Sequence, residues 1–548
     1  MSIIDWIILG VTLCGIIMYG VYKSRTTQNL DGYFLTNRSM PWYLVLLSIM
    51  GTQASAITFL SAPGQAYTDG MRFVQYYFGL PLAMIVICIA FVPIFRKLKV
   101  YTAYEFLEQR FDLKTRTFTS ILFQLSRGVS TGISIYAPSL ILSSLLGWNI
   151  YWTNIFMGGL LIIYTVSGGA KAVAYTQKLQ LIIIIAGMFI AGYMLVHLMP
   201  ANIGFLDALG IGAKSGKVNV ITTGMTDKGF DWKDKYNIWS GIIGGFFLAL
   251  SYFGTDQSQV GRYLTAKDNR ESKIGLLMNG LVKVPMQFLI LLIGVLVFTF
   301  YQYNKAPIYF DTAQASFAKQ TGYKDSLVYL EKQYDLLSII NDKEKIGEIK
   351  EQYKNVMKKA LPDQEVKDTN YIFLRFVIDY LPKGLIGLLI AVIFLAAWGS
   401  IAAALNALAS CTVVDIHKKF IQKELTHERD YRLAKIYTLF WGLFSIAVAQ
   451  FASNLGNSLI ETVNILGSLF YGVILGIFLV AFWLKGIKGN ATFYAALISE
   501  GLVVLIYKWD IISFLWLNVI GALLVIIIGA IFQMFFNNVP DKIKVQEG

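Results

Sequence analysis

The sequence contains few charged side chains for its length. Asp, Glu, Lys and Arg make up 15% of its 548 residues, whereas a soluble domain carries about 25%. Hydrophobic residues make up 56%, and the mean hydropathy is +0.57. A chain so poor in charge and so rich in apolar side chains is a membrane protein rather than a soluble globular one.

Cysteine and histidine are also scarce, with three residues of each. Cys14, Cys88 and Cys411 all fall inside apolar segments, which excludes a disulfide framework and a zinc site. The sequence shows no metal-ligand cluster, nucleophile motif or paired carboxylates, so we expect neither an enzyme nor a cofactor. The net charge of +13 comes from bases dispersed through short loops, whereas nucleic-acid binding needs a basic face.

Long apolar stretches dominate what is present. About thirteen of them are roughly 20 residues long, the length that a helix needs to cross about 30 Å of hydrocarbon. The first lacks a preceding basic region, so it predicts a membrane helix rather than a cleaved signal peptide. The sequence therefore predicts an all-α membrane protein with about 13 transmembrane helices.

The distribution of basic residues predicts the orientation. Lys and Arg gather in loops that share one side of the membrane: KSR at 23, RKLK at 96, RYLTAKDNRESK at 262 and HKKFIQKELTHERDYRLAK at 417. That side is expected to be cytoplasmic. We therefore expect a multi-pass protein of the inner (plasma) membrane, with its N-terminus outside and its C-terminus in the cytoplasm. The polar stretch 302–383 becomes an extracytoplasmic, mainly helical insertion.

Two apolar spans are interrupted by polar residues. The second reads SIMGTQASAITFLSAPG from residue 48, and the seventh reads FFLALSYFGTDQSQVGR from residue 246. Small and hydroxylated residues can simply allow close helix packing, but this explains Gln53, Asp256 and Gln257 poorly. Two interrupted spans lying five spans apart indicate two inverted repeats with a solute cavity between them.

Seven motifs carry a resemblance to a known family. They are DGYFLTNRSMPW at 31, YTAYEFLEQRF at 101, IYAPSLIL at 135, SGGAKAVAYTQ at 167, DQSQVGRYLTAK at 256, LPKGLIGLL at 381 and LNALASCTVVDIHKKF at 405. In this order the chain resembles the sodium/solute symporters, which include glucose, iodide, monocarboxylate, multivitamin, proline and sialic acid carriers. The resemblance implies the leucine-transporter fold with inverted five-helix repeats, and sodium-driven symport of a small organic solute by alternating access.

The resemblance also implies a division of the chain. A leading helix and cytoplasmic loop occupy 1–42, and the trailing helices and cytoplasmic tail occupy 485–548. The first repeat covers 43–198, the second covers 238–484 with the insertion, and an extracytoplasmic loop at 199–237 joins them. We expect a functional monomer whose partners are the solute, the sodium ion and membrane lipid, with no nucleic acid.

An ion site between two helices follows from the same resemblance. Sodium would be bound by the backbone carbonyls of Gly51, Ala54 and Ala396 and by the hydroxyl of Ser400. The sequence departs from the family at Gly399, where many members have a second hydroxyl residue. On this reasoning Gly399→Ser restores a ligand.

A second departure concerns the coupling residues Gln177 and Lys178. Many family members carry a carboxylate where this chain has Gln177, and Lys178 follows it. A desolvated lysine ammonium can occupy a cation site, so sodium-independent or proton-coupled transport with Lys178 replacing the ion stays open. Alternatively, Lys178 extends to the membrane interface.

Candidate solute-binding residues that match the family's central cavity are Gln53, Tyr77, Lys283 and Asn464. Thr58, in the interrupted second span, is a further candidate. Tyr252 matches one of an aromatic pair that gates the inner face of this cavity, although it could instead serve packing. Ile57 and Tyr77 stand where acids are expected in sugar carriers. Glucose recognition in the usual way is therefore not expected.

Arg127 is a further candidate because it lies inside an apolar span, where a charge is costly and indicates function. Its guanidinium could bind a carboxylate through two hydrogen bonds. It could instead form a buried structural pair with Asp256 or extend to the interface. The sequence favours an organic anion or a vitamin-like carboxylate as the solute, with a sugar as the second choice.

Overall fold

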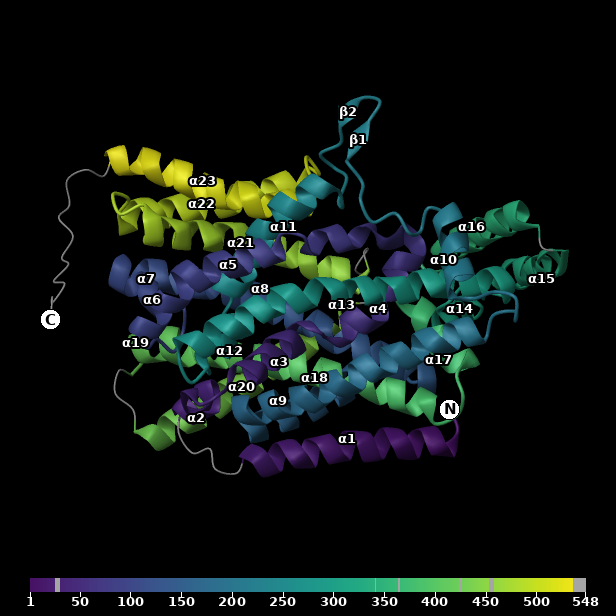
Figure 1. Ribbon diagram of the computed structural model, residues 1–548, viewed down its shortest axis with the longest axis horizontal. Coiled ribbons are helices and arrows are strands. Elements are labelled where there is room, and N and C mark those ends of the chain that lie inside the picture. The colour runs from purple at the N-terminus through teal and green to yellow at the C-terminus, as the bar shows by residue number, and fades with distance from the viewer. Residues whose placement is uncertain (25–29, 341, 363–364, 423–425, 453–457, 536–548) are drawn as a thin grey trace.

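The computed structural model describes residues 1–24, 30–340, 342–362, 365–422, 426–452 and 458–535. Long helices run side by side through most of the molecule (Figure 1). The start of α1 and the helices α14 to α17 lie at one end of this bundle, and α19 and the end of α23 lie at the opposite end. The start of the first helix and the end of the last described helix therefore lie at opposite ends of the bundle.

Most of the described residues are helical. The first half contains α1 (Ile3–Ser24), α2 (Leu30–Leu35), α3 (Trp42–Gln53), α4 (Ala56–Asp69), α5 (Leu80–Val86), α6 (Val92–Lys97), α7 (Glu105–Arg110), α8 (Leu113–Leu146), α9 (Ile150–His197), α10 (Phe205–Lys214) and the hairpin of β1 (Met225–Thr226) and β2 (Gly229–Phe230). The second half contains α11 (Gly245–Gly254), α12 (Gln257–Leu264), α13 (Asn269–Tyr303), α14 (Thr312–Ala318), α15 (Lys324–Ile340), α16 (Lys343–Ala360), α17 (Ile372–Tyr380), α18 (Leu385–Cys411), α19 (Lys418–Phe420), α20 (His427–Ala449), α21 (Leu459–Trp483), α22 (Gly489–Lys508) and α23 (Phe514–Phe535).

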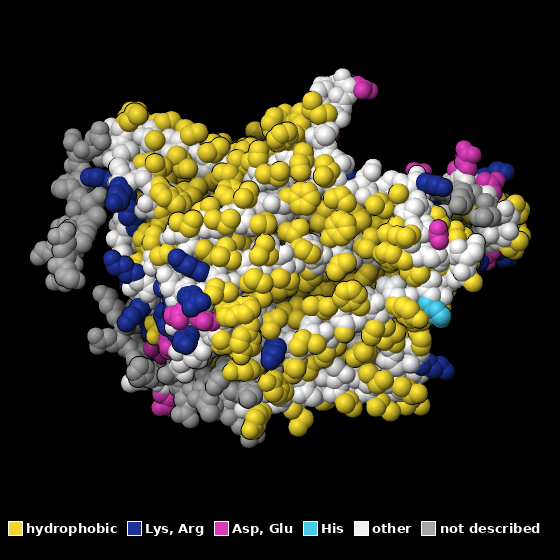
Figure 2. Space-filling view, viewed as in Figure 1, with side chains coloured by type: hydrophobic (Ala, Val, Ile, Leu, Met, Phe, Trp, Pro, Cys, Tyr) yellow, Lys and Arg dark blue, Asp and Glu magenta, His cyan; other side chains and the backbone are white. Residues whose placement is uncertain are grey.

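The number of membrane-crossing segments agrees with the prediction. In the described part of the chain, 10 helices are long and apolar enough to cross a membrane, and three shorter apolar helices accompany them: Trp42–Gln53, Ile150–Val166 and Ser240–Gly254. Figure 2 shows a broad hydrophobic surface between ends that carry the charged side chains. The central hydrophobic band of the surface therefore suits contact with the hydrocarbon of a bilayer.

Two predicted spans lie within the single helical element α9. The hydroxyls of Tyr164 and Thr176 hydrogen bond at 2.7 Å, although twelve residues of straight helix would separate them by about 18 Å. The helix must therefore bend sharply between these two residues. The segments on either side of the bend, Ile150–Val166 and Val173–His197, correspond to the two predicted spans.

The two interrupted spans are broken at mid-length. The first break separates α3 from α4 at Ala54 and Ser55, and the second separates α11 from α12 at Thr255 and Asp256. Irregular backbone at this depth is tolerated only where it lines a cavity or is buried in protein. The breaks thus mark the region where a polar site can form.

The insertion between α13 and α18 folds mainly as helices, as predicted. Its helices α14 to α16 share a small hydrophobic core of their own, which includes Leu327, Tyr353 and Met357. Figure 1 shows these helices projecting from one end of the bundle. The insertion is thus a compact addition beside the membrane-crossing helices.

Candidate functional site

One cavity opens between the two helix breaks. Its walls come from α3, α4, the short helix Gly70–Tyr77, α5, α8, α11, α12, α13, α18 and α21. The centre of a water molecule can reach a volume of about 140 Å³ inside it. Since one water needs about 10–15 Å³ on this measure, roughly ten waters or one small organic solute fit.

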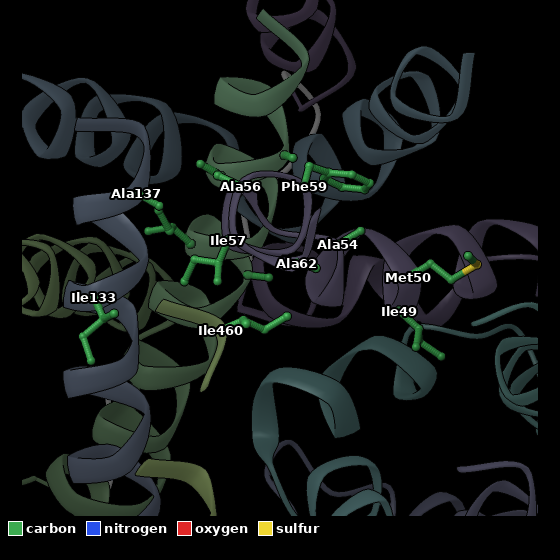
Figure 3. Packing of buried hydrophobic residues seen from close by; sticks show 14 of the residues in the cluster. Ile49, Met50, Ala54, Ala56, Ile57, Phe59, Ala62, Ile133, Ala137 and Ile460 are labelled. Carbon is green, nitrogen blue, oxygen red and sulfur yellow. The ribbon is translucent and has the colours of Figure 1, made fainter. Parts of the chain in front are cut away.

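All seven candidate solute-binding residues line this cavity. They are Gln53, Thr58, Tyr77, Arg127, Tyr252, Lys283 and Asn464. Figure 3 shows Ile57 of α4 lying between Ala137 of α8 and Ile460 of α21. The structure thus brings together residues that are up to 411 positions apart in the sequence, although it does not test which of them bind a solute.

Lys283 is a buried cation in the cavity wall. Its side chain is 2% exposed, and its Nζ lies 5.5 Å from the centre of the Tyr77 ring. Among the described residues, no carboxylate forms an ion pair with Lys283 within 4.0 Å. None of the described residues that line the cavity is Asp or Glu. The Lys283 amine therefore lies in the cavity wall without a carboxylate partner among the described residues.

Arg127 has a different environment, because it forms a buried ion pair. Its Nε donates a hydrogen bond to Asp256 Oδ2 at 3.1 Å, and its Nη2 bonds to the same oxygen. The Arg127 side chain is 12% exposed and the Asp256 side chain is fully buried. The alternative that Asp256 neutralises Arg127 is therefore realised, and Arg127 is only partly available to a solute.

Two neutral side chains leave polar atoms unpaired beside the cavity. Tyr76 donates to Asn464 Oδ1 at 3.0 Å, but Asn464 Nδ2 has no hydrogen-bond partner in the described part of the chain. The same holds for Gln53 Oε1. Buried polar atoms are normally satisfied, so this donor and this acceptor suit a solute that carries both kinds of group.

The break after α3 frees backbone oxygens at the expected ion site. The Ser55 N–H bonds to the Gln53 carbonyl at 2.9 Å rather than to the Gly51 carbonyl four residues back. Ala54 leaves the helix with φ −78° and ψ 66°. The carbonyls of Gly51 and Ala54 are therefore released from the helical ladder, and oxygen is the ligand that hard cations prefer.

The opposite wall of the ion site is α18. Ser400 lines the cavity, and its hydroxyl donates to the Ala397 carbonyl at 3.0 Å, which leaves its oxygen lone pairs available. The preceding turn carries Ala396. Gly51 lies on α3 and Ala396 and Ser400 lie on α18, two helices that pack together, while Ala54 directly follows α3.

Gln177 joins these two elements. Its Oε1 accepts a hydrogen bond from the Ser48 hydroxyl at 2.9 Å, and its Nε2 donates to the Gly399 carbonyl at 3.2 Å. The side chain is fully buried. The neutral amide thus bridges the walls of the ion site from α9.

The expectation that Gly399→Ser restores a ligand stays a prediction, and the structure shows what a serine would meet there. A Cβ atom at Gly399 would lie 2.6 Å from Gln180 Oε1 and 3.2 Å from Gln177 Cγ. A serine there requires the Gln180 amide, the end of a flexible side chain, to move. Gln177 and Gln180 of α9 thus lie beside the position where many family members have a second hydroxyl.

The alternative that Lys178 replaces the ion does not fit the position of this side chain. Lys178 is exposed, and its Nζ lies 5.9 Å from the centre of the Tyr43 ring, which is itself 44% exposed. The neighbouring Gln177 points into the bundle, whereas Lys178 lies on its outer face. The interfacial role fits this position.

Sequence reasoning missed Tyr471. This residue of α21 accepts a hydrogen bond from Arg127 Nη2 at 2.6 Å and donates to Asp256 Oδ2 at 2.8 Å. It lies within a long apolar stretch, where a lone tyrosine is usually part of the core. Its only signal was the nearby Asn464, two helical turns earlier in the same span.

Comparison with known proteins decides the family. Residues 33–322 and 351–499 match the sodium:solute symporter family. The chain belongs to that family. It is therefore a membrane transporter that couples the movement of a solute to sodium by alternating access, as the motifs implied.

The most similar relatives include two symporters with different solutes. The sodium/sialic acid symporter NanT of Aliivibrio fischeri is 25% identical over 99% of this chain and 95% of its own length. The sodium/iodide cotransporter of Homo sapiens is 28% identical over 50% of this symporter and 41% of its own length.

A solved structure confirms the leucine-transporter fold. The substrate-bound outward-open state of a Na⁺-coupled sialic acid symporter matches with a TM-score of 0.78. It covers 98% of each chain at 24% identity. This match supports the fold of the symporter and leaves its solute open.

Proposed function

We propose that this symporter carries an organic anion with a carboxylate group in the central cavity. The main support is the buried amine of Lys283, which has no carboxylate partner in a cavity wall without described acidic residues. Arg127 adds a second, partly neutralised cation. Asn464 Nδ2 and Gln53 Oε1 offer a donor and an acceptor for the polar groups of the solute.

This assignment changes the roles expected from the sequence. Lys283 is the first partner of the carboxylate in the arrangement described, because Asp256 occupies the Nε edge of Arg127 there. Thr58, Tyr77 and Tyr252 would contact the rest of the solute. Sialic acid, which carries a carboxylate and is the solute of two relatives, is the first compound to examine.

The proposed sodium ligands are the carbonyls of Gly51, Ala54 and Ala396 and the hydroxyl of Ser400. The donor set fits sodium, because it consists of uncharged hard oxygens beside a helix break. Gln177 would hold the two sides of this site at their spacing. Sodium binding would thereby fix α3 against α18.

The arrangement in the membrane is part of the proposal. We place the α19 end of the bundle in the cytoplasm and the insertion outside, in the inner (plasma) membrane. Lys and Arg side chains gather at the α19 end (Figure 2), which agrees with the positive-inside rule. The proposed protein acts as a monomer in lipid, without enzymatic activity, and its repeats correspond to 43–198 and 238–484.

Removal of the carboxylate charge tests the proposed solute class. Sialic acid should compete for uptake at least about tenfold better than its methyl ester, because a hydrogen bond to a charged group contributes about 1.5–3 kcal/mol. Competition is measured in proteoliposomes with a sodium gradient, and pyruvate and methyl pyruvate form a second pair. Equal inhibition by acid and ester in both pairs, or inhibition by glucose alone, would contradict an anionic solute.

A further inference from the structure

Three buried side chains form one hydrogen-bonded group beside the cavity, which we call the Arg127 cluster: Arg127, Asp256 and Tyr471. They come from α8, from the break between α11 and α12, and from α21. Arg127 and Tyr471 both hydrogen bond to Asp256 Oδ2. The cluster therefore connects the broken helix to two other helices.

The second oxygen of Asp256 fixes the start of α12. Asp256 Oδ1 accepts hydrogen bonds from the backbone N–H of Ser258 at 2.8 Å and from its hydroxyl at 2.6 Å. This is the N-cap interaction that satisfies a free N–H at the start of a helix. One carboxylate thus both starts α12 and holds it against α8 and α21.

Breaking this cluster is costly unless another anion takes the place of Asp256. Removing one partner of a buried ion pair leaves an uncompensated charge in a poorly solvated site. A carboxylate on the solute is chemically the same ligand for a guanidinium. Arg127 also lines the cavity that would hold this solute.

We propose that the carboxylate of the solute replaces Asp256 on Arg127, and that this exchange releases α12 from α8 and α21. The inference rests on the proposed anionic solute. A ligand shifts a conformational equilibrium only if it binds one state better than the other. The pair of Arg127 with the solute carboxylate exists only in the state in which α12 is released, so the solute favours that state. Without solute the cluster stays closed. Asp256 and Tyr471 are positioning residues that act through Arg127.

Cys411 provides a reporter for this release. It is fully buried on α18, eleven residues beyond Ser400, which corresponds to about 16 Å along the helix toward the α19 end. A parent protein with Cys14→Ser and Cys88→Ala keeps Cys411 as its single thiol. Its rate of alkylation by N-ethylmaleimide in reconstituted membranes then measures opening at the α19 end.

Asp256→Asn should raise the alkylation rate about tenfold without solute, since loss of the pair shifts the population toward the open state. Sialic acid with sodium should accelerate the parent and have no further effect on Asp256→Asn. Tyr471→Phe keeps both charges and should give a smaller increase, which also provides a test if Asp256→Asn does not fold. Tyr193→Phe, at a residue that is 66% exposed, should match the parent.

Parent-like rates in both folded variants, together with acceleration of the parent by sialic acid, would overturn the role of the cluster and leave the solute class intact. Faster rates in the variants, without acceleration of the parent by sialic acid or pyruvate, would overturn the exchange and the anionic solute together. The acid and ester competition separates these two failures independently.

Discussion

Lys283→Gln is expected to raise the concentration of carboxylate solute needed for half-maximal uptake by roughly 10- to 150-fold. The estimate follows from losing a hydrogen bond to a charged group in a desolvated site, which contributes about 1.5–3 kcal/mol. Glutamine keeps most of the side-chain length and removes the charge. Sodium-driven uptake of labelled sialic acid in proteoliposomes measures the effect.

The thermal stability of Lys283→Gln gives a second test, because loss of a lysine with a purely structural role would lower the melting temperature. Lys283 is buried without a described ion-pair partner, so its removal should leave the melting temperature unchanged or raise it. Lys178→Gln is the matched control, because that lysine is exposed and its loss should leave uptake unchanged. Normal half-saturation in Lys283→Gln would remove this residue from the solute site.

Ser400→Ala is expected to raise the sodium concentration for half-maximal uptake by roughly 5- to 30-fold. The hydroxyl of Ser400 is the single side-chain oxygen among the four proposed ligands, and the loss of one such ligand is expected to cost about 1–2 kcal/mol. The half-saturating solute concentration at saturating sodium should change much less. Uptake measured over a series of sodium concentrations separates the two effects.

Ser410→Ala is the matched control for Ser400→Ala. Ser410 lies on the same helix, is buried, and donates to the Ala407 carbonyl at 2.8 Å, so its backbone hydrogen bond copies that of Ser400. It does not line the described cavity. A sodium dependence that shifts equally in both variants would point to a general effect on α18 rather than to ion binding.

The helix breaks and the cavity could be predicted from the sequence. Gln53 and Asp256 stand out in apolar spans because polar groups at membrane depth need a partner or a cavity. Each break lies within a few residues of these positions. Periodicity and composition were sufficient to predict the breaks, because a bilayer allows few arrangements in which polar backbone groups are satisfied.

The environment of individual side chains could not be predicted in the same way. Lys178 and Gln177 are adjacent in sequence but lie on different faces of α9, and which of the two faces the interior depends on how α9 packs against other helices. The space beside Gly399 is filled by Gln180, three residues further along α9 than Gln177. Such contacts arise from packing between distant segments, which no local pattern records.

The different partners of Arg127 and Lys283 could not be predicted from the sequence either. Both are basic residues inside apolar spans, so their sequence contexts are alike. Only the fold shows that Asp256 and Tyr471 pair with Arg127, while Lys283 faces the Tyr77 ring. The candidate for anion recognition therefore shifted from one cation to the other.

Uptake of sialic acid into proteoliposomes, with external sodium replaced by choline at fixed pH, tests the central claim most directly. Sodium-driven symport of an organic anion predicts concentrative uptake in sodium that is abolished in choline and is inhibited by excess pyruvate or unlabelled sialic acid. Equal uptake in sodium and choline would contradict the proposed coupling. Sodium-dependent uptake of glucose, without uptake of any carboxylate, would contradict the proposed solute.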